Sequence, residues 1–536
     1  MRDPEKRAPV SPQIALKLET VWGERGVSTS MSVFRPGNTC WRTARADRAA
    51  FLIDNEAYFT AIFHALEKAQ RSVLLLGWGF DPRTRLFPDG YDGPNDPDEV
   101  GRILVELARA RPELDIRLLI WRSALPIAAS QEFFPHRARR FFRGTPVKFR
   151  LDDAVPFGAC HHQKVLVVDD KVAFCGGGDI SVDRWDSPAH RDYDQRRIMP
   201  RQACHDPRHE VMMMVDGAAA RALGELARER WRRATGEVVA PPPETEGDPW
   251  PNHVPAQLHG PEIAVARTEP EWKGRPMVDE ILQLTLQCIA EAKRTIYLEN
   301  QYFTSPIIGE ALAARLAEPD GPEVVVVSTG HAPSWFDHMT MDRARGAVIW
   351  RLRAADVFGR FRALWPATWG GETIIVHSKV TVIDDRIVRV GSANLNNRSG
   401  GFDTECEIGV EAADNDTRVQ IEVFRDRLVG HFMGHTGDKV AKARAEHGGL
   451  APAIDALNRE RRLMPIEPPR TTRLGDFITR YHIGDPQDTR DAWRPGRRRE
   501  RLYKEARALI AQADADAAAD DEAGAALTSK SITSGR

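Results

Sequence analysis

The sequence has no apolar run long enough to cross a membrane and no signal-peptide core. No stretch of its 536 residues approaches the roughly 18 consecutive apolar residues of a membrane span, and the amino-terminal segment MRDPEKRAPVSPQ is polar. We therefore expect a soluble, cytoplasmic protein that could associate with a membrane only peripherally.

Clustered cysteines and a strong net charge are missing as well. The six cysteines are scattered, without a CxxC pair or a metal-ligand cluster, so reduced thiols in the core are the default interpretation. The 75 Lys and Arg residues nearly balance the 77 Asp and Glu residues, for a formal net charge of -2. This balance provides no global field to gather a nucleic acid. We expect no metal, no cofactor and no nucleic-acid partner.

What the sequence does contain is an internal repeat. The segment HHQKVLVVDDKVAFCGGGDIS at 161–181 aligns with VHSKVTVIDDRIVRVGSANLN at 376–396, and the spacing HxKxxxxD is the same in both. Upstream, KAQRSVLLLGWGFD at 68–81 aligns without a gap on EAKRTIYLENQYFT at 291–304. The chain therefore reads as two related halves, each a β-and-α domain of about 200 residues.

Strand patterns such as SVLLLGW and EVVVVST alternate with helical patterns in each half, which favours an α/β fold over an all-β fold. A Pro-rich stretch, VVAPPPETEGDPWPNHVP, separates the halves and reads as a linker. The expected organisation is an N-terminal extension (1–44), an N-terminal half (45–237), the linker (238–255), a C-terminal half (256–435), a helical and basic extension (436–510) and a disordered tail (511–536).

A histidine and a lysine two positions apart at the start of a strand point to the same side, because strand residues alternate with a period of two. These residues are His162 and Lys164 in the first motif, and His377 and Lys379 in the second. A pseudo-dyad would bring them together as a site for a phosphoryl group. The lysines can neutralise charge on its oxygens. One imidazole can attack phosphorus while the other gives a proton to the departing alcohol.

Further candidates follow from the same repeat. Glu210 and Glu405 hold equivalent places just before strands, and we expect these carboxylates to fix the tautomers of the two imidazoles. Donors from Ser392 and Asn394 can help to hold the phosphate. The aromatic-bearing loops after the upstream strands are either core corners or part of the pocket. Lining of the pocket is the favoured interpretation for Trp78, Asn300 and Tyr302.

These residues resemble the phospholipase D superfamily, also called the HKD family. The resemblance covers roughly residues 45–435. It rests on the two complete HxKxxxxD motifs, on GSAN and NRSGGFDTE in the second half, and on LENQYFTS at 298–305. The two-copy pattern looks like the larger enzymes of the family, and less like its short nucleases, which carry one copy per chain and dimerise.

The resemblance implies a pseudo-symmetric, duplicated phospholipase D fold, with two sandwich domains of sheet and helices around one shared active site. It gives the role of nucleophile to His162, and that of general acid and then base to His377. It also implies that the motif aspartates, Asp169 and Asp384, are structural rather than in contact with phosphorus. We expect the protein to be a monomer.

The first copy departs from the second at two positions. Gly177 and Asp179 stand where the second copy has Ser392 and Asn394. We therefore expect the first half to supply fewer donors to a phosphate, and an ionised Asp179 would repel a phosphodiester.

The expected function is that of a phospholipase D, which hydrolyses a glycerophospholipid at a membrane surface to phosphatidic acid and the headgroup alcohol. An acceptor alcohol in place of water would give transphosphatidylation. A cardiolipin synthase uses the same chemistry with phosphatidylglycerol as acceptor, but such enzymes usually carry amino-terminal membrane spans. A nuclease is disfavoured by the charge balance. An inactive lipid-binding scaffold would be expected to have lost a histidine or lysine, and both copies are intact.

Overall fold

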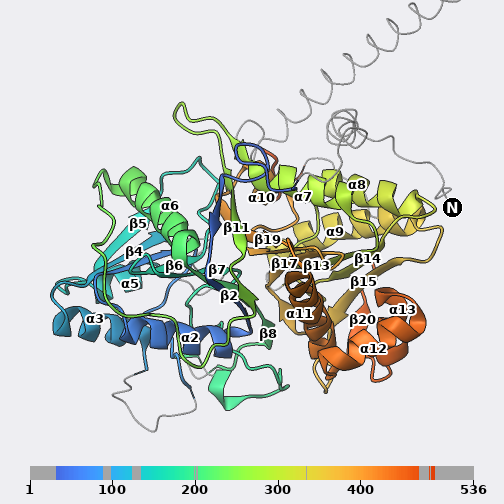
Figure 1. Ribbon diagram of the computed structural model, residues 1–536, viewed down its shortest axis with the longest axis horizontal. Helices are drawn as coiled ribbons and strands as arrows, with labels where there is room; N and C mark the ends of the chain where they lie inside the picture. The colour runs from blue at the N-terminus through green and yellow to red at the C-terminus, as the bar shows by residue number, and fades with distance from the viewer. Residues whose placement is uncertain are drawn as a thin grey trace, which may run out of the picture.

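The computed structural model consists of two large mixed β-sheets that lie side by side, with helices packed on both faces of each (Figure 1). The α/β class expected from the sequence is therefore confirmed. The arginine-rich segment RPGRRRER (494–501) of the expected basic extension and the expected disordered tail (511–536) lie outside the described residues. The structure describes residues 32–88, 98–123, 135–197, 199–200, 203–332, 335–469, 482 and 484–488.

The first sheet has the strand order β10-β2-β9-β7-β6-β3-β4-β5. Strands β3, β4 and β5 are parallel to one another, whereas the other neighbours in this order are antiparallel. Its strands are β2 (Arg48–Ile53), β3 (Ser72–Gly77), β4 (Asp115–Trp121), β5 (Lys148–Asp152), β6 (Val165–Val168), β7 (Val172–Gly176), β9 (Val211–Asp216) and β10 (Leu258–His259).

The second sheet repeats this arrangement. Its order is β1-β11-β19-β18-β17-β13-β14-β15-β20, and the stretch from β11 to β15 matches the stretch from β2 to β5 strand for strand. Its first strand comes from the segment before the N-terminal sheet. Its strands are β1 (Arg42–Arg45), β11 (Glu262–Glu269), β12 (Val278–Asp279), β13 (Thr295–Asn300), β14 (Glu323–Val327), β15 (Phe361–Pro366), β17 (Lys379–Ile383), β18 (Ile387–Gly391), β19 (Glu405–Glu411) and β20 (Leu463–Pro465).

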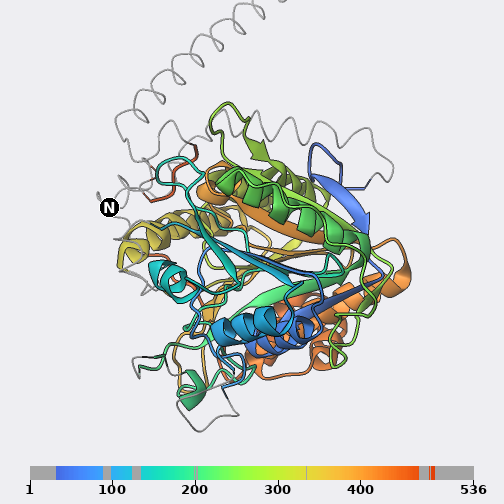
Figure 2. The same cartoon turned by 90° about the vertical axis from the view of Figure 1, so that its left-hand side faces the viewer.

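Helices cover both faces because the central strands are apolar on both. In β3, Val73 and Leu75 pack in a cluster with α2 and α3, whereas Leu74 and Leu76 pack in another with α6, on the opposite face (Figure 2). The helices are α2 (Asn55–Glu67), α3 (Val100–Ala110), α5 (Pro135–Phe141), α6 (Gly217–Thr235), α7 (Glu280–Glu291), α8 (Pro306–Ala317), α9 (Trp335–Ala355), α10 (Asn397–Gly401), α11 (Asn415–Met433), α12 (Gly437–His447) and α13 (Leu450–Leu457).

The two halves share one core and exchange backbone pairings. Cys175 and Cys406, one from each half, are buried with their sulfur atoms 3.8 Å apart. Strand β8 (Arg208–His209) of the first half pairs in parallel with β16 (Ile375–Val376) of the second. At the equivalent place in the repeat, His161 of the first half and Thr404 of the second form an isolated parallel β-bridge. Each motif is therefore held beside the other half.

The motif aspartates end their strands and bind backbone amides. Asp169 and Asp384 both have a positive φ, of 54° and 56°. The carboxylate of Asp169 accepts the three N–H groups of residues 70–72, each at 2.7 Å, and that of Asp384 accepts those of 293–295 at 2.7 to 3.3 Å. Each carboxylate thus joins the turn after a motif strand to the start of the neighbouring strand, β3 or β13.

Replacing Asp169 with alanine should lower the free energy of unfolding by about 3 kcal/mol, because three N–H groups lose a charged acceptor. Asp169→Asn keeps one acceptor oxygen and should lose less. Urea unfolding followed by circular dichroism measures both changes.

The exposed Asp153→Ala serves as the control and should leave the unfolding midpoint in place. A structural role for Asp169 would be rejected if Asp169→Ala removed turnover while its unfolding curve matched that of the unmodified protein.

Candidate active site

Each motif histidine is paired with the glutamate of the other half. His162 Nδ1 lies 2.9 Å from Glu405 Oε2, and His377 Nδ1 lies 2.9 Å from Glu210 Oε1. The crossing follows from the exchanged pairings, because β16 runs into His377 beside the strand that ends at His209. In the same way the bridge at residue 161 places the next residue beside Glu405. Each glutamate thus takes the tautomer-fixing position expected of it, on the opposite half's ring.

Burial sets the charge state of these groups. Desolvation, reinforced by the nearby lysines, holds the pKa of both His162 and His377 well below the usual value. Desolvation also raises the pKa of Glu405 to about 7 and that of Glu210 above its usual value. A neutral ring that donates from Nδ1 to a carboxylate keeps its lone pair on Nε2. Both imidazoles are thereby prepared to act as bases or nucleophiles through Nε2.

The motif lysines are almost fully buried and face the same space. Lys164 Nζ donates to the carbonyl oxygen of His162 at 2.9 Å, and Lys379 Nζ donates to that of His377 at 2.5 Å. Burial lowers the pKa of Lys379 to about 7. Each lysine also lowers the pKa of the other half's histidine, so the four side chains form one electrostatic unit. An anionic group placed among them would gain strongly from these charges.

Two serine hydroxyls donate hydrogen bonds to the carboxylate of Glu405. Ser392 Oγ donates to Oε2 at 2.5 Å, and Ser399 Oγ donates to Oε1 at 2.6 Å. The single hydroxyl hydrogen of Ser392 is therefore used on the glutamate. In this geometry Ser392 positions Glu405, and its expected part in holding a phosphate stays a prediction.

The first half replaces both hydroxyls. A Cβ at Gly177 would lie 2.7 Å from the carbonyl oxygen of His377 and 2.9 Å from Glu210 Oε2, so a serine does not fit there. Arg184 takes the place of Ser399, with Nη1 3.7 Å from Glu210 Oε1. Sequence reasoning missed this pair, although extending the repeat alignment five residues beyond GSAN would have matched the two positions. One glutamate is held by hydroxyls and the other by a cation.

One of the expected pocket residues, Asn300, connects two loops through its side chain. Asn300 is buried; its Oδ1 accepts the N–H groups of Leu395 at 3.0 Å and Tyr302 at 3.2 Å, and its amide donates to the carbonyl of Ala393. It fixes the turn that carries Asn394, a half-buried side chain whose Oδ1 has no hydrogen bond among the described residues. Of this group, Tyr302 and Asn394 are the side chains with some surface left for a ligand.

The matching corner of the first half is built by Asp179. Its Oδ1 accepts the N–H groups of Trp78 and Gly79 at 2.9 and 3.1 Å, and its Oδ2 lies 3.3 Å from Lys164 Nζ. This ion pair offsets the charge that would repel a phosphodiester. The Trp78 ring stacks on Trp121 with 5.7 Å between centroids and remains partly exposed.

Two family models match the chain over the parts that contain these motifs. The model described as "Phospholipase D" matches residues 65–244, and that described as "Cardiolipin synthase, PLD-like domain" matches residues 285–428. The chain belongs to the phospholipase D superfamily. The resemblance read from the two motifs is thereby confirmed.

Curated relatives in this superfamily are distant in sequence. Phospholipase D2 of Bos taurus is 23% identical over 470 residues, covering 68% of this chain and 49% of the relative. Phospholipase D alpha 4 of Arabidopsis thaliana is 24% identical over 495 residues, covering 71% of this chain and 63% of the relative. Phospholipase D A of Dictyostelium discoideum is 25% identical, covering 75% of this chain and 36% of the relative. The chain thus spans between about a third and two thirds of the length of these relatives.

A phosphatidylserine synthase structure from Haemophilus influenzae Rd KW20 superposes with a TM-score of 0.48 at 11% identity, covering 82% of this chain and 99% of that chain. Among the described helices, none combines the length and the apolar character that crossing a membrane requires.

The hydroxyl contacts of Glu405 give a prediction for the pH profile of phosphodiester turnover. Only the ionised carboxylate carries the negative charge that stabilises a positive His162 ring, so activity should fall as the pH drops through about 7. Removing the Ser392 hydroxyl takes away a donor that lowers this pKa. In Ser392→Ala the acid limb should therefore move to higher pH, as measured by initial rates over a pH series.

Glu405→Gln should lose this limb altogether, at a much lower plateau rate. Glu411→Gln, farther along β19, is the control and should keep the original profile. An acid limb at the same pH in Ser392→Ala would contradict the assignment to Glu405.

Proposed function

We propose that this chain is a phospholipase D-type phosphodiesterase, which cleaves a glycerophospholipid on the headgroup side and passes the phosphatidyl group to water or an alcohol. One observation carries the proposal. Two imidazoles, of which His377 is buried and His162 half-buried, are each bound through Nδ1 to a glutamate of the other half and share their surroundings with two buried lysines. Membership of a phosphodiesterase family supports the reaction class.

In the first step Nε2 of His162 attacks phosphorus, and the bond from phosphorus to the headgroup oxygen breaks. His377, as imidazolium, gives its proton to that oxygen and the headgroup leaves as an alcohol. Glu405 stabilises the positive charge that develops on the attacking ring. The product of this step is a phosphatidyl group on His162.

In the second step the oxygen of water or an alcohol attacks the same phosphorus and gives its proton to the now neutral His377. The phosphorus–nitrogen bond breaks and its electron pair returns to His162. The product is phosphatidic acid when water attacks, and a new phosphatidyl ester when an alcohol attacks.

The negative charge of the bound substrate favours the protonation of His377, with a proton taken from solvent, that this scheme needs. Without an anion the lysines and burial favour neutral imidazoles. A phosphodiester bound between Lys164 and Lys379 offsets their charge, and an imidazolium at His377 then gains an anionic neighbour in addition to Glu210. The assignment of the attacking ring to His162 follows the family pattern, because the geometry is nearly symmetric.

A cardiolipin synthase-type transfer is the second candidate. The description of the family model that matches residues 285–428 supports it. Its chemistry differs only in the acceptor, which would be the hydroxyl of a phosphatidylglycerol.

Product analysis tests these functions. Purified protein incubated with vesicles of phosphatidylcholine, phosphatidylethanolamine and phosphatidylglycerol should yield phosphatidic acid, and phosphatidylethanol when ethanol is present. His162→Ala and His377→Ala should each lower the rate by about a thousandfold or more, because both rings act in one reaction. Mass spectrometry identifies the lipids.

His447→Ala, at an exposed position at the end of α12, should keep full activity. Strong activity in both single histidine variants would reject the shared site. Cardiolipin as the main product would select the second candidate, and cleavage of an oligonucleotide with the lipids intact would select a nuclease.

The covalent route predicts where the phosphatidyl group is held. A substrate with p-nitrophenol as leaving group needs little protonation, so His377→Ala should still complete the first step slowly and stall at the second. Rapid quench followed by peptide mapping should then find the adduct on His162. Two displacements also predict retained configuration with a chiral phosphorothioate substrate.

Inversion at phosphorus would reject the covalent intermediate. An adduct on His377 in the corresponding His162 variant would keep the intermediate and reverse the two roles.

A further inference from the structure

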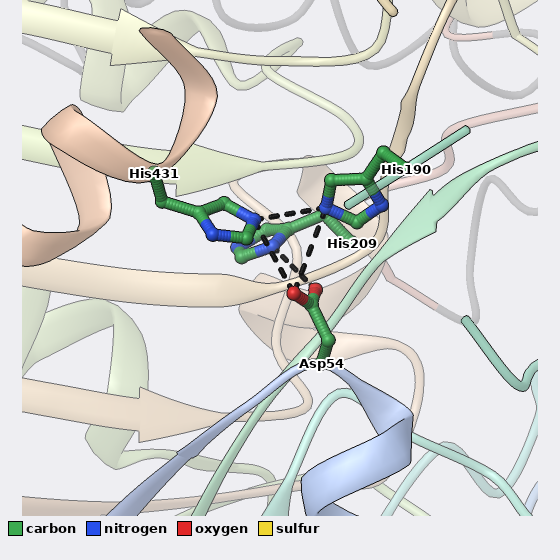
Figure 3. Close-up of side chains that lie close together, drawn as sticks. All are labelled: Asp54, His190, His209 and His431. Carbon is green, nitrogen blue, oxygen red and sulfur yellow. Dashed lines mark hydrogen bonds and ion pairs between the residues drawn. The ribbon is translucent and has the colours of Figure 1, made fainter. Parts of the chain in front are cut away.

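Behind the proposed active site lies a second cluster of titratable side chains, formed by Asp54, His190, His209 and His431 (Figure 3). Asp54 precedes α2, His190 lies in the loop after β7, His209 ends β8 and His431 lies on α11 of the other half. Their side chains are between 0 and 9% exposed. One nitrogen or oxygen from each falls within 4.8 Å of the others.

Carboxylates orient two of the three rings. His190 Nδ1 lies 2.8 Å from Asp186 Oδ2, which turns Nε2 of the ring toward the cluster. His209 Nε2 lies 3.0 Å from Glu299 Oε2, which leaves Nδ1 facing inward. Metal-binding histidines characteristically donate their outer N–H to a carboxylate in this way.

These outer carboxylates are themselves held in place. Asp186 Oδ2 accepts the backbone N–H of Arg208 at 2.8 Å. Glu299 accepts the hydroxyls of Tyr297 at 2.6 Å and Ser378 at 2.7 Å. The inner nitrogens of the two rings are therefore fixed in direction, as a built ligand set requires.

The inner atoms crowd one point. The Nε2 atoms of His190 and His431 are 2.8 Å apart, and Asp54 Oδ2 lies 3.2 Å from His431 Nε2 and 3.6 Å from His190 Nε2. His209 Nδ1 lies 2.8 Å from the other oxygen of Asp54. Despite this crowding, Asp54 Oδ2 has no hydrogen bond of acceptable geometry among the described residues.

The backbone of Asp54 is also unusual. Its φ of 66° is in the left-handed region, which residues other than glycine seldom adopt. Its N–H donates to the carbonyl of Glu210 at 2.8 Å, which holds this conformation. A strained residue that aims a buried carboxylate at two imidazoles points to a function for that carboxylate.

We propose that Asp54, His190, His209 and His431 bind a zinc ion. Imidazole nitrogens and carboxylate oxygens both bind zinc, and three of the first with one of the second complete a tetrahedral set of four ligands. The ion replaces the protons that otherwise have to lie between these atoms. The cluster is sealed from solvent and its four ligands leave no open position, so the ion takes no part in the phosphoryl chemistry.

The proposed ion supports the reaction site through the backbone. The carbonyl of His209 accepts the N–H of His377 at 2.8 Å, and the N–H of Asp54 donates to Glu210. Both partners are members of the same histidine–glutamate pair. Since His431 belongs to the second half and the other ligands to the first, the ion also links the halves. The proposed ion departs from the expectation of no metal drawn from the sequence, although the phosphoryl chemistry itself still needs none.

Metal content and spectroscopy test this proposal without an activity assay. Full-length protein purified without a histidine tag should contain one zinc per chain by inductively coupled plasma mass spectrometry. After removal of the ion with a chelator, adding Zn²⁺ should raise the Tm by about 5 °C or more. Co²⁺ should give the intense visible absorption of a tetrahedral site.

His431→Gln should lose the zinc, the cobalt absorption and the Tm shift while keeping its far-ultraviolet circular dichroism. His447→Gln should keep all of them. If His431→Gln fails to fold, Asp54→Asn takes its place. If both fail, the cobalt spectrum of the unmodified protein decides, because exposed histidines and carboxylates give only weak octahedral bands.

Unmodified protein that neither contains nor binds Zn²⁺ or Co²⁺ would overturn the proposal and leave a hydrogen-bonded cluster. Zinc retained with an unchanged cobalt spectrum in a folded His431→Gln or Asp54→Asn variant would also overturn it, because the ion would then lie elsewhere.

Discussion

The exchange of partners between the halves is the constraint on which the proposed site depends. Neither His162 nor His377 finds its carboxylate within its own half. Each glutamate is buried, where an unpaired charge is costly, so the halves must dock closely enough to complete both pairs. The short pairing of β8 with β16, and the bridge at residues 161 and 404, establish that register through the backbone. The shared core then fixes it.

Much of this arrangement could be predicted because it follows from local sequence patterns that occur twice. Two copies of HxKxxxxD predict two strands with a histidine and a lysine on one side, and the aligned flanks place a glutamate in each half. The α/β class and the family followed from the same segments. The partner of each glutamate did not, because it depends on how two domains dock. Ser392 shows the same limit. The sequence does not say whether its hydroxyl donates to a phosphate, as expected for Asn394, or to the carboxylate of Glu405.

The buried histidine cluster was beyond sequence reasoning for a different reason. Its members stand at positions 54, 190, 209 and 431, so they have none of the short spacings that mark metal-binding motifs. Asp54 and His190 lie outside the aligned repeat segments, and His431 lies on a helix whose inward face the pattern alone does not resolve. The adjacency of His209 to Glu210 was the available signal, and it drew attention to the glutamate alone. Likewise, nothing local indicated that β1 would join the second sheet.

The difference between the two glutamate environments has a consequence for how such a chain can diverge. Glu405 with its two serines serves the ring of His162, and Glu210 with Arg184 serves the ring of His377. The tuning of each histidine is therefore inherited with the opposite half of the gene. Two sequences recombined at the Pro-rich segment would carry every motif intact and still join each ring to a carboxylate adjusted for another enzyme. Although the fold arose as a repeat, its halves have ceased to be interchangeable modules.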